Sequence, residues 1–535
     1  MMYDPNVYAY PSRRMVVYGQ NGMVATSHHL AAQIGLDIMK EGGNAIDAAV
    51  ATAAALTVLE PISNGIGGDA FAIVWTNDKL YGLNSSGPFP GGISAQAVRA
   101  AGHTQMPLYG WLPVTVPGAP AAWRALIERF GRLSLADVLR PATAYARNGF
   151  PVPPCISEAW QSFYQQARNS LTDQIYESWF ATFSSNGRAP HPGEIWQTPD
   201  HADTLQRIAE TNAEAFYCGE IAEKIDRFSR QSGGYLRFAD LAAYHPEWVD
   251  PVSVHYHGFD VWELPPNGQG LVALMALGML NNDTFTERDV LDEVHRQIES
   301  IKMAFSVGKQ HITDPKDMFV SVNELLSDQH LAECRNQMTE AASNHPGIIP
   351  KGSNTVYLAT ADGHGNMVSF IQSNYKNFGS YLVVPGTGIA LQNRGADASL
   401  DEQHVNIVKG GKRPYHTIIP GFLSKDGAPV GPFGVMGATM QPQGHLQILM
   451  NTIDFHLNPQ AALDAPRWRW IGGNTVAVEK GLPDHLIHGL QQKGHVIEVQ
   501  EKSSFFGRGQ IIWRSPFNTL IGGTEPRADG AVVSF

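Results

Sequence analysis

Cysteine is scarce in this sequence, with three residues, Cys155, Cys218 and Cys334, among 535. They are far apart and odd in number, and none forms a pair with the spacing of a metal site. A disulfide framework is therefore excluded as the organising feature of the fold. We expect free thiols, as is usual for a cytoplasmic protein.

Long hydrophobic runs are also missing. No stretch of about 18 apolar residues occurs, which excludes an obvious membrane-spanning helix. The first 14 residues, MMYDPNVYAYPSRR, lack an apolar core of the length that a secretory signal needs. No basic cluster accompanies the net charge of −12, so nucleic acid is not an expected partner. These absences predict a cytoplasmic protein with neither a membrane nor a nucleic-acid partner.

The overall composition is typical of a globular protein. Hydrophobic residues make up 43% and charged residues 16% of the chain. The 53 glycines and 34 prolines predict many tight turns. The length fits one large two-lobed unit or two to three domains.

Helical spacing dominates the first part of the chain. Thr26 and Ser27 are good N-caps for a helix that ends at Gly42-Gly43-Asn44. An alanine-rich helix, expected to be buried, then runs from Asp47 through Leu59. Further helices are predicted within 120–147 and 200–245, and over 271–280 and 290–311.

The glycine-rich run Ser63–Phe71 could cradle a phosphate, but it lacks the Lys-Ser/Thr ending of a P-loop and follows no strand. We interpret it as a structural turn whose glycines permit close backbone approach.

The sequence pattern changes near residue 355 from mainly helix-forming to mainly strand-forming. Residues 325–354 are polar and irregular, and they are the best linker candidate. Thr355–Ala361 and Met367–Gln372 then predict a β-hairpin around the turn 362–366. Further strands are expected near 382–392, 416–423, 430–436, 475–479 and 510–513, with helices over 442–456 and 483–493.

Several catalytic motifs are absent. The sequence contains no HExxH zinc motif and no Gly-x-Ser-x-Gly elbow. Its 20 histidines offer candidates for a Ser-His-Asp triad, but no local pattern selects one of them.

Thr355 begins a predicted strand directly after the linker. A chain-terminal threonine carries a hydroxyl nucleophile and an α-amine whose pKa, about 8, suits a base at neutral pH. One residue then supplies both groups needed for covalent amide cleavage. An internal Thr355 has no free amine, so this chemistry requires prior scission of the Asn354–Thr355 bond.

The chain resembles the γ-glutamyltransferase (γ-glutamyltranspeptidase) family of N-terminal-nucleophile (Ntn) hydrolases over nearly its whole length. The matching motifs are Gly22–Ser27, Gly42–Ala49, Asn64–Gly68, Asp362–Asn366, Lys412–Pro414, Gly434–Gly437 and Asp464–Arg467. Their number and order make the resemblance specific.

The resemblance implies roles for individual residues. The nucleophile of the family falls on Thr355, and the hydroxyl that supports its amine falls on Ser373. The carboxylate that holds the amino group of the substrate falls on Asp397. The backbone pair of the oxyanion hole falls on Gly437 and Ala438, where N–H donors suit a tetrahedral intermediate.

Departures from the family pattern concern the substrate. The transpeptidases place a carboxylate-binding arginine where this chain has Asn84–Pro88, which contains none. The substrate-binding Ser-Ser pair of the family is replaced by His416-Thr417, and an asparagine is replaced by Tyr375. These changes resemble the divergent branch that includes oxamate amidohydrolase, cephalosporin-acylase-like proteins and soluble glutathione-hydrolase-like proteins.

Arg394 stands where the family has a glutamine. Its planar fork matches a carboxylate, so it could replace the lost arginine as a clamp. The alternative is a structural ion pair with Asp397 or another acid.

The family implies an α+β fold, a four-layer αββα sandwich, autoprocessed into a large chain 1–354 and a small chain 355–535 that form one structural unit. It implies a hydrolase without metal or organic cofactor. The expected substrate is a small carboxylate-bearing amide, either oxamate (to oxalate and ammonia) or a γ-glutamyl compound such as glutathione. Association of the two-chain unit into a homo-oligomer is left open.

Two alternatives remain. One is an acylase for glutaryl- or cephalosporin-type amides, with Trp75, Phe89 and Trp111 as candidates for a roomier amine pocket or for the core. The other is a non-catalytic relative, whose mark would be a chain that stays uncut. Cutting predicts bands of roughly 38 and 20 kDa, from 354 and 181 residues.

Overall fold

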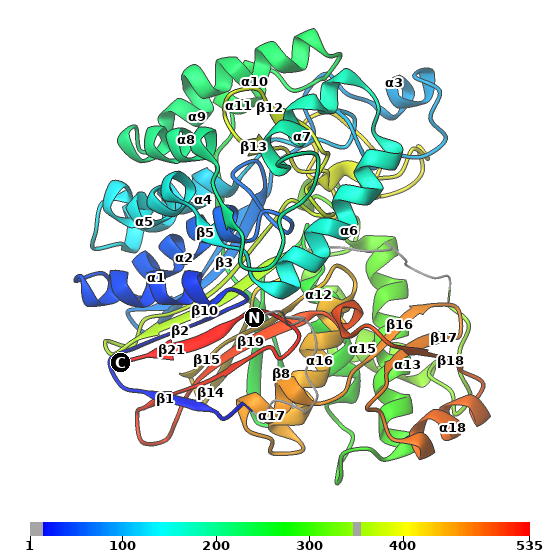
Figure 1. Cartoon of the computed structure of the whole chain (residues 1–535). Helices are drawn as coiled ribbons and strands as arrows, with labels where there is room; N and C mark the ends of the chain where they lie inside the picture. The colour runs from blue at the N-terminus through cyan, green and yellow to red at the C-terminus, as the bar shows by residue number, and fades with distance from the viewer. Residues whose placement is uncertain (1–13, 346–354) are drawn as a thin grey trace.

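The computed structural model describes residues 14–345 and 355–535, so Asn354, the residue expected to precede the scission point, lies outside the described residues. Two seven-stranded sheets form the centre of the molecule (Figure 1). The strands of the first sheet follow the order β1 (Val17–Gly19), β20 (Leu520–Thr524), β19 (Arg508–Arg514), β15 (Ala428–Met436), β14 (Gly421–Lys425), β9 (Phe259–Glu263) and β8 (Val252–Tyr256). Those of the second follow the order β21 (Ala531–Ser534), β2 (Gly22–Thr26), β10 (Val356–Asp362), β11 (Met367–Ser373), β3 (Asp69–Thr76), β4 (Lys79–Ser85) and β7 (Glu247–Val249).

The predicted hairpin after residue 355 is confirmed as β10 and β11, in the middle of the second sheet. Val356 lies opposite Gln372 in antiparallel register. β10 pairs on its other side with β2, and β11 pairs with β3. Strands from both sides of residue 355 share each sheet, and the segments 14–345 and 355–535 both contribute residues to the same buried hydrophobic clusters.

The two sheets pack face to face. Apolar side chains from the second sheet meet those of the first sheet in one buried cluster, whose members include Phe71, Ile73, Tyr357, Met367, Phe422, Met436 and Ile512. Alternate residues of these strands point into this layer, as the two-residue period of a strand requires.

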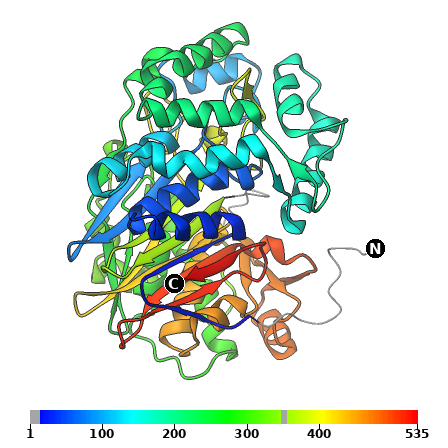
Figure 2. The ribbon, with the colours of Figure 1, turned by 60° about the vertical axis from the view of Figure 1, so that its left-hand side comes forward.

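Helices cover the outer face of each sheet (Figures 1 and 2). Over the second sheet lie α1 (His29–Lys40) and α2 (Ala45–Leu59), followed outward by α4 (Ala119–Phe130), α5 (Leu135–Asn148) and α8 (Pro199–Glu210). Over the first sheet lie α12 (Gly270–Leu280), α13 (Leu291–His311) and α16 (Met440–Ile453). Every residue of α2 is buried, which explains its alanine-rich sequence, since small side chains permit contact on all sides.

The remaining elements surround this centre. Helices α3 (Ala95–Ala100), α6 (Pro154–Ser170), α7 (Glu177–Phe183), α9 (Glu214–Cys218), α10 (Glu220–Gln231) and α11 (Phe238–Ala242) precede residue 345, with the short pair β5 (Phe150–Pro151) and β6 (Ile195–Trp196). A three-stranded sheet of β16 (Trp468–Gly472), β17 (Thr475–Glu479) and β18 (Val496–Gln500) packs with α18 (Asp484–Gln492), and α17 (Pro459–Asp464) packs against β19 and β20 of the first sheet.

Two predicted helix starts were wrong by a few residues. Thr26 belongs to β2, where it lies opposite Leu358, and the N-cap of α1 is His28, whose ring accepts the N–H of Leu30. The second helix begins before Asp47, because Asn44 caps it and forms a reciprocal capping box with Asp47.

The expected irregular linker over 325–354 was also partly wrong. It contains α15 (Asp328–Asn336), capped by Ser327, after the short α14 (Val322–Leu325). Leu331 and Cys334 are buried against the core, and this tertiary packing stabilises a helix of mostly polar sequence. The strand expected near 382–392 is two short strands, β12 (Val383–Val384) and β13 (Ile389–Ala390), and the strand expected from 416 begins at Gly421.

The three cysteines are free thiols in the structure. Among the described residues, no helix is both long enough and apolar enough to cross a membrane.

Candidate active site

Thr355 is fully buried and lies immediately before β10. Its Oγ1 is 3.0 Å from Oγ of Ser373, the last residue of β11. The hairpin register causes this contact, because the pair Val356–Gln372 sets the next residues, Thr355 and Ser373, side by side. The Ser373 hydroxyl also accepts the backbone N–H of Tyr375 at 2.8 Å.

The glycine-rich turn packs against this pair, as its interpretation as a structural turn predicts. A Cβ atom on Gly68 would lie 2.5 Å from the carbonyl oxygen of Ser373, so only glycine fits there. The carbonyl of Gly68 accepts the N–H groups of Gly118 and Ala119 at 2.9 Å, which joins this turn to the start of α4.

Gly437 and Ala438 form the turn between β15 and α16. Both have positive φ, 138° and 51°, and Ala438 is a non-glycine residue in the left-handed region. The carbonyl of Ala438 accepts the side-chain amide of Gln269 at 2.8 Å. Among the described residues, no partner accepts a hydrogen bond from the N–H of Gly437 or Ala438. The turn is thus held through its carbonyls, and its two N–H groups remain available as donors.

Arg394 and Asp397 lie three residues apart on a 3-10 turn, and they form an ion pair of 2.9 Å. The other Nη of Arg394 donates to Oγ1 of Thr417 at 2.7 Å. The ring of Tyr375 covers the guanidinium at 3.4 Å, and its hydroxyl donates to Asp397. The structural ion pair considered for Arg394 is therefore present, and Arg394 contacts two other substituted residues, Tyr375 and Thr417.

The Arg394 side chain is fully buried, yet only some of its N–H groups form hydrogen bonds. The bonds to Thr417 and Asp397 use two of the five N–H groups of a guanidinium, and Nε has no partner among the described residues. The Asp397 side chain is 24% exposed. The pair thus lies at the border between the interior and the surface.

His416 pairs with Asp69, the first residue of β3. Its Nε2 is 3.1 Å from Oδ2 of Asp69, and its Nδ1 accepts the N–H of Ile418. This second bond requires the neutral tautomer with the proton on Nε2. Burial lowers the pKa of His416 well below its usual value, which agrees with a neutral ring.

The other oxygen of Asp69 accepts three hydrogen bonds, from the N–H groups of Gly87 (3.2 Å) and Gly118 (3.1 Å) and from the side chain of Gln392 (2.8 Å). Burial raises the pKa of Asp69 to about 7 in spite of these donors. Asp69 therefore joins four separate segments at the edge of the site.

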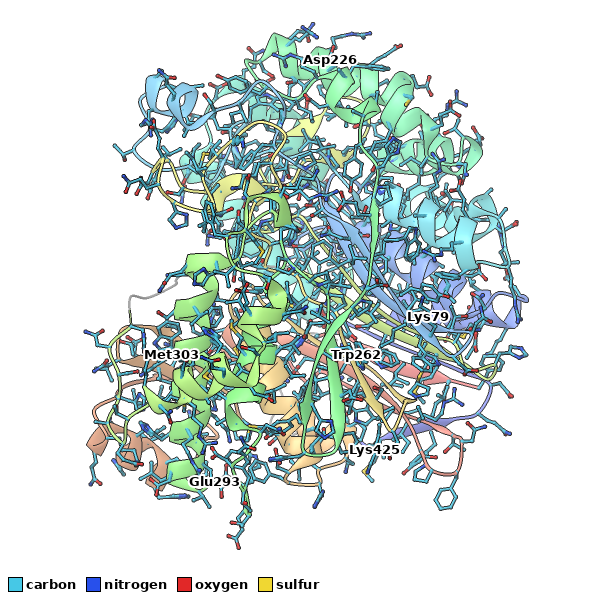
Figure 3. The ribbon with its side chains drawn as sticks, turned by 180° about the vertical axis from the view of Figure 1, so that it is seen from behind. Lys79, Asp226, Trp262, Glu293, Met303 and Lys425 are labelled. Atoms are coloured by element: carbon cyan, nitrogen blue, oxygen red, sulfur yellow. The ribbon has the colours of Figure 1, made fainter. Side chains whose placement is uncertain are left out.

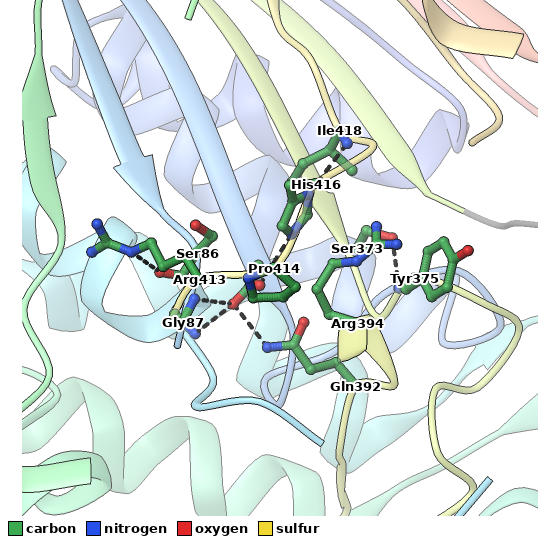
Figure 4. Close-up of polar contacts among 12 residues, drawn as sticks. Ser86, Gly87, Ser373, Tyr375, Gln392, Arg394, Arg413, Pro414, His416 and Ile418 are labelled. Carbon is green, nitrogen blue, oxygen red and sulfur yellow. Dashed lines mark hydrogen bonds and ion pairs between the residues drawn. The ribbon is translucent and has the colours of Figure 1, made fainter. Parts of the chain in front are cut away.

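The segment 84–88, which lacks the family arginine, is contacted by an arginine from elsewhere in the chain (Figure 4). Nε of Arg413 donates to the carbonyl of Ser86 at 2.9 Å. The same guanidinium is paired with Glu247 at 2.6 Å, so its charge is already matched by a protein carboxylate.

Sequence reasoning missed Asp69 and Gln392 as parts of the site. Asp69 follows directly on the glycine-rich turn, and a buried acid at the start of an apolar strand is the signal that could have found it. No local signal points to Gln392.

The three aromatic residues considered for an amine pocket belong to the core. Trp75 stacks on Phe422 between the sheets. Phe89 and Trp111 are 1% and 6% exposed and lie in two other hydrophobic clusters.

One buried cluster has a donor set that suits a metal ion, His295, Glu299 and His495. Lys302 already occupies it, with Nζ 2.7 Å from Glu299 and 3.4 Å from Nδ1 of His495. Hydrogen bonds continue from His495 to His295 and from His295 to the carbonyl of Thr339, each 2.9 Å long. An ammonium inside the cluster disfavours a cation, so we interpret it as a structural network that anchors the chain near Thr339.

Comparison with known proteins identifies the class. The sequence model of the γ-glutamyltranspeptidase family matches residues 31–535. The chain belongs to this family, and it is an enzyme that hydrolyses amide bonds.

Its relatives carry several activities in their names. The chain is 37% identical to the glutathione hydrolase-like YwrD proenzyme of Bacillus subtilis, over 97% of this chain and 99% of that protein. It is 33% identical to the oxamate amidohydrolase proenzyme of Klebsiella pneumoniae, over 96% and 98%. The crystal structure of a cephalosporin acylase from Bacillus halodurans superposes with a TM-score of 0.97 at 57% identity, covering 100% of this chain and 99% of that one.

Proposed function

We propose that this chain is a proenzyme, that it is cut between Asn354 and Thr355, and that Thr355 then hydrolyses amides of small carboxylate-bearing acyl groups. The observation that carries the proposal is the buried contact of Thr355 Oγ1 with Ser373 at 3.0 Å. It gives a threonine at the start of a central strand a hydroxyl partner in a water-poor environment. The proenzyme names of two relatives support the cut.

The reaction then follows in two steps. The Thr355 hydroxyl attacks the amide carbonyl, and the freed α-amine of the same residue takes the hydroxyl proton. The N–H groups of Gly437 and Ala438 stabilise the oxyanion of the tetrahedral intermediate. The proton passes to the leaving nitrogen, the C–N bond breaks, and an ester to Thr355 remains. Water cleaves this ester, which releases the acid and restores the hydroxyl.

Arg394 is the proposed clamp for the carboxylate of the acyl group. It keeps free N–H groups while it is bonded to Asp397 and Thr417, so the ion pair and the clamp are compatible roles. The guanidinium is covered by Tyr375, and we therefore expect this ring to move aside when a substrate binds. Oxamate and a γ-glutamyl compound such as glutathione both present the required carboxylate.

A second candidate is hydrolysis of a glutaryl or cephalosporin-type amide. It is favoured by the 57% identity and the TM-score of 0.97 with a cephalosporin acylase. A glutaryl group also ends in a carboxylate, so the same clamp would serve it. We further propose that the two sheets with their outer helices are the four-layer αββα sandwich of Ntn hydrolases, and that chains 1–354 and 355–535 stay together after the cut.

A denaturing gel tests the cut, and an assay of product release tests the substrate. Purified protein should give bands of roughly 38 and 20 kDa, the shares of 354 and 181 residues. Thr355→Ala should remain one band and be inactive. Oxamate, glutathione, a γ-glutamyl-anilide and a glutaryl-amide should then be compared for kcat/KM. A wild-type chain that stays uncut on incubation would contradict the assignment of Thr355 as the nucleophile.

A further inference from the structure

Gln269 is a polar side chain at the start of a buried, otherwise apolar helix. It follows β9, whose Trp262 is labelled in Figure 3, and it directly precedes α12, which is built of glycine and apolar residues. Gln269 itself is fully buried. Burying an amide costs free energy unless its groups find hydrogen-bond partners. The partners of Gln269 therefore indicate its role.

The Gln269 amide is fully bonded, and both of its donors go to carbonyls of the candidate site. Nε2 donates to the carbonyl oxygen of Thr417 at 2.6 Å and to that of Ala438 at 2.8 Å, while Oε1 accepts the hydroxyl of Tyr415 at 3.0 Å. Carbonyl oxygens can only accept, so the two carbonyls fix the orientation of the amide. The backbone N–H of Gln269 donates to the carbonyl of His416 at 2.9 Å, which holds the residue beside the same segment.

The bond to Ala438 ties the oxyanion turn, Gly437–Ala438, to a second segment of the site. The backbone donors to the two carbonyls of this turn are Met440 and Gln441, which belong to the first turn of α16. Among the described residues, Gln269 is the one side chain that donates to either carbonyl. Ala438 has a φ of 51°, and a non-glycine residue keeps this left-handed conformation only where its surroundings hold it. Gln269 supplies such a contact from outside the turn.

The bond to Thr417 leads to the clamp and to the proposed nucleophile. The Thr417 hydroxyl accepts an N–H of Arg394 at 2.7 Å, and the ring of Tyr375 covers that guanidinium. The N–H of Tyr375 donates to the hydroxyl of Ser373 (Figure 4), which contacts that of Thr355. An unbroken series of contacts thus connects the oxyanion turn, by way of one buried amide, to the nucleophile.

We propose that Gln269 is a positioning residue that fixes the oxyanion turn relative to the carboxylate clamp at Arg394. A small acyl group held by its carboxylate at the clamp must bring its amide carbonyl to the N–H groups of Gly437 and Ala438. The separation of clamp and turn therefore decides which acyl length reacts, and one amide bonded to a carbonyl on each side sets this separation. The inference rests on the proposed function, because it needs the clamp at Arg394 and the oxyanion hole at this turn.

The test begins with Gln269→Met, which removes both donors and keeps a side chain of similar length. With the best substrate of the release assay, it should lower kcat about a hundredfold and change KM by less than about threefold, since a misplaced oxyanion hole acts on the transition state. Gln269→Glu keeps the shape and the oxygen that binds Tyr415 but loses the same donors, so kcat should fall at least as far. Rates are expressed per cut chain on a denaturing gel, which removes any effect of slower processing.

Two ligands of the same acyl group separate positioning from folding. For a glutaryl group they are the aldehyde 5-oxopentanoate and the acid glutarate. When the Thr355 hydroxyl adds to the aldehyde, its oxygen bonds to the carbonyl carbon, the electron pair of the C=O bond moves to the oxygen at the oxyanion turn, and the hydroxyl proton passes to the α-amine. Glutarate binds at the clamp without such an adduct. Gln269→Met should raise the inhibition constant of the aldehyde about a hundredfold and that of glutarate by less than about threefold.

Gln447→Met is the matched control. Gln447 is a buried glutamine on α16 whose Nε2 also donates to two carbonyls, those of Gln443 at 3.0 Å and Trp468 at 2.9 Å. Its Oε1 accepts the N–H of Trp468 at 3.1 Å. Gln447→Met should therefore lower the Tm about as much as Gln269→Met does, while kcat and both inhibition constants stay at their wild-type values.

The outcomes distinguish the two levels of the proposal. A kcat of Gln269→Met within about threefold of the wild type, or equal weakening of both ligands, would overturn the role of Gln269 and leave the proposed function intact. So would two Gln269 variants that fail to fold while Gln447→Met folds, because Gln269 would then serve stability alone. A wild-type chain that stays uncut and hydrolyses none of the amides would overturn the proposed function itself.

Discussion

The hydroxyl of Thr355 lies 3.0 Å from that of Ser373, and Ser373 is itself held by the N–H of Tyr375 at 2.8 Å. Ser373 therefore has a fixed position before any substrate arrives. All three residues are buried, so little water competes for these bonds. The pair is arranged by a hairpin at the centre of a sheet, and a rigid element of this kind can hold a nucleophile within the tolerance that catalysis needs.

The first prediction concerns this hydroxyl pair. Ser373→Ala should slow the appearance of the two bands and lower kcat about a hundredfold, because Thr355 loses the partner that orients it. Ser373→Thr keeps the hydroxyl and should retain most of the activity. The measurements are a time course on a denaturing gel and steady-state kinetics of the processed enzyme. Wild-type processing and kcat in Ser373→Ala would contradict the role of this hydroxyl.

The second prediction separates the clamp from the ion pair. Arg394→Lys keeps a charge for Asp397 but loses the fork that also reaches Thr417. It should lower kcat/KM at least about tenfold for a glutaryl amide. For the butyryl amide, whose acyl group lacks the carboxylate, kcat/KM should fall far less. Arg394→Gln should have a larger effect and also reduce thermal stability, since it leaves Asp397 without its cation.

Arg124→Gln is the surface control for these variants, because it removes an exposed arginine paired at 2.9 Å with Glu128. Its kinetics should equal those of the wild type. If Arg394→Lys lowers the rates on both amides by the same factor, Arg394 has only a structural role.

The sequence predicts the hairpin of β10 and β11 well, because the signals for it are local. Two β-branched, apolar runs flank a turn, and the contact of Thr355 with Ser373 spans only 18 positions. The family pattern added the expectation that Thr355 is the nucleophile. Neither source predicts the partner of His416, since Asp69 is 347 positions away and meets it only after the sheets assemble.

The same limit explains the errors in the fold. α15 is polar in sequence, and the burial of Leu331 and Cys334 that stabilises it is a tertiary effect. Thr26 has the chemistry of an N-cap, yet the antiparallel pairing of β2 with β10 uses it in a strand. For Arg394, residue type allowed both a clamp and an ion pair, and only the fold revealed that Tyr375 and Thr417 bind the same guanidinium.

The third prediction compares two histidine–aspartate pairs of equal length. His416 and Asp69 are 3.1 Å apart and buried. His255 and Asp260 are also 3.1 Å apart, but His255 is exposed and Asp260 is only partly buried. His416→Ala leaves a buried carboxylate oxygen without its donor, which should cost about 1–3 kcal/mol and lower the Tm. His255→Ala should change the Tm very little, because exposed pairs contribute about 0–1 kcal/mol.

His416→Ala should also reduce activity, since His416 holds the segment that places Thr417 against Arg394. Thermal unfolding and kcat/KM of both variants check the prediction. Equal Tm changes in His416→Ala and His255→Ala would show that burial does not strengthen the pair.

The fourth prediction is that acid destabilises this fold through its buried histidines. Burial lowers the pKa of His28, His445 and His495 to about 3 and that of His201 to about 4. The unfolded chain binds protons at these residues below about pH 6.5, whereas the folded chain remains neutral until a much lower pH. The unfolded state then binds more protons, so stability falls as the pH falls from about 6.5 towards 4, by up to about 1.4 kcal/mol per pH unit for each histidine.

Thermal unfolding at pH 7.5 and pH 5.0, at constant ionic strength, measures this loss. His201 lies 3.0 Å from the hydroxyl of Thr57, so His201→Gln should lower the Tm at pH 7.5. The drop in Tm from pH 7.5 to pH 5.0 should be smaller in this variant than in the wild type. His488 is exposed on α18, and His488→Gln should leave the fall unchanged. A His201→Gln variant whose Tm falls as much as that of the wild type would mean that proton uptake at His201 does not drive acid unfolding.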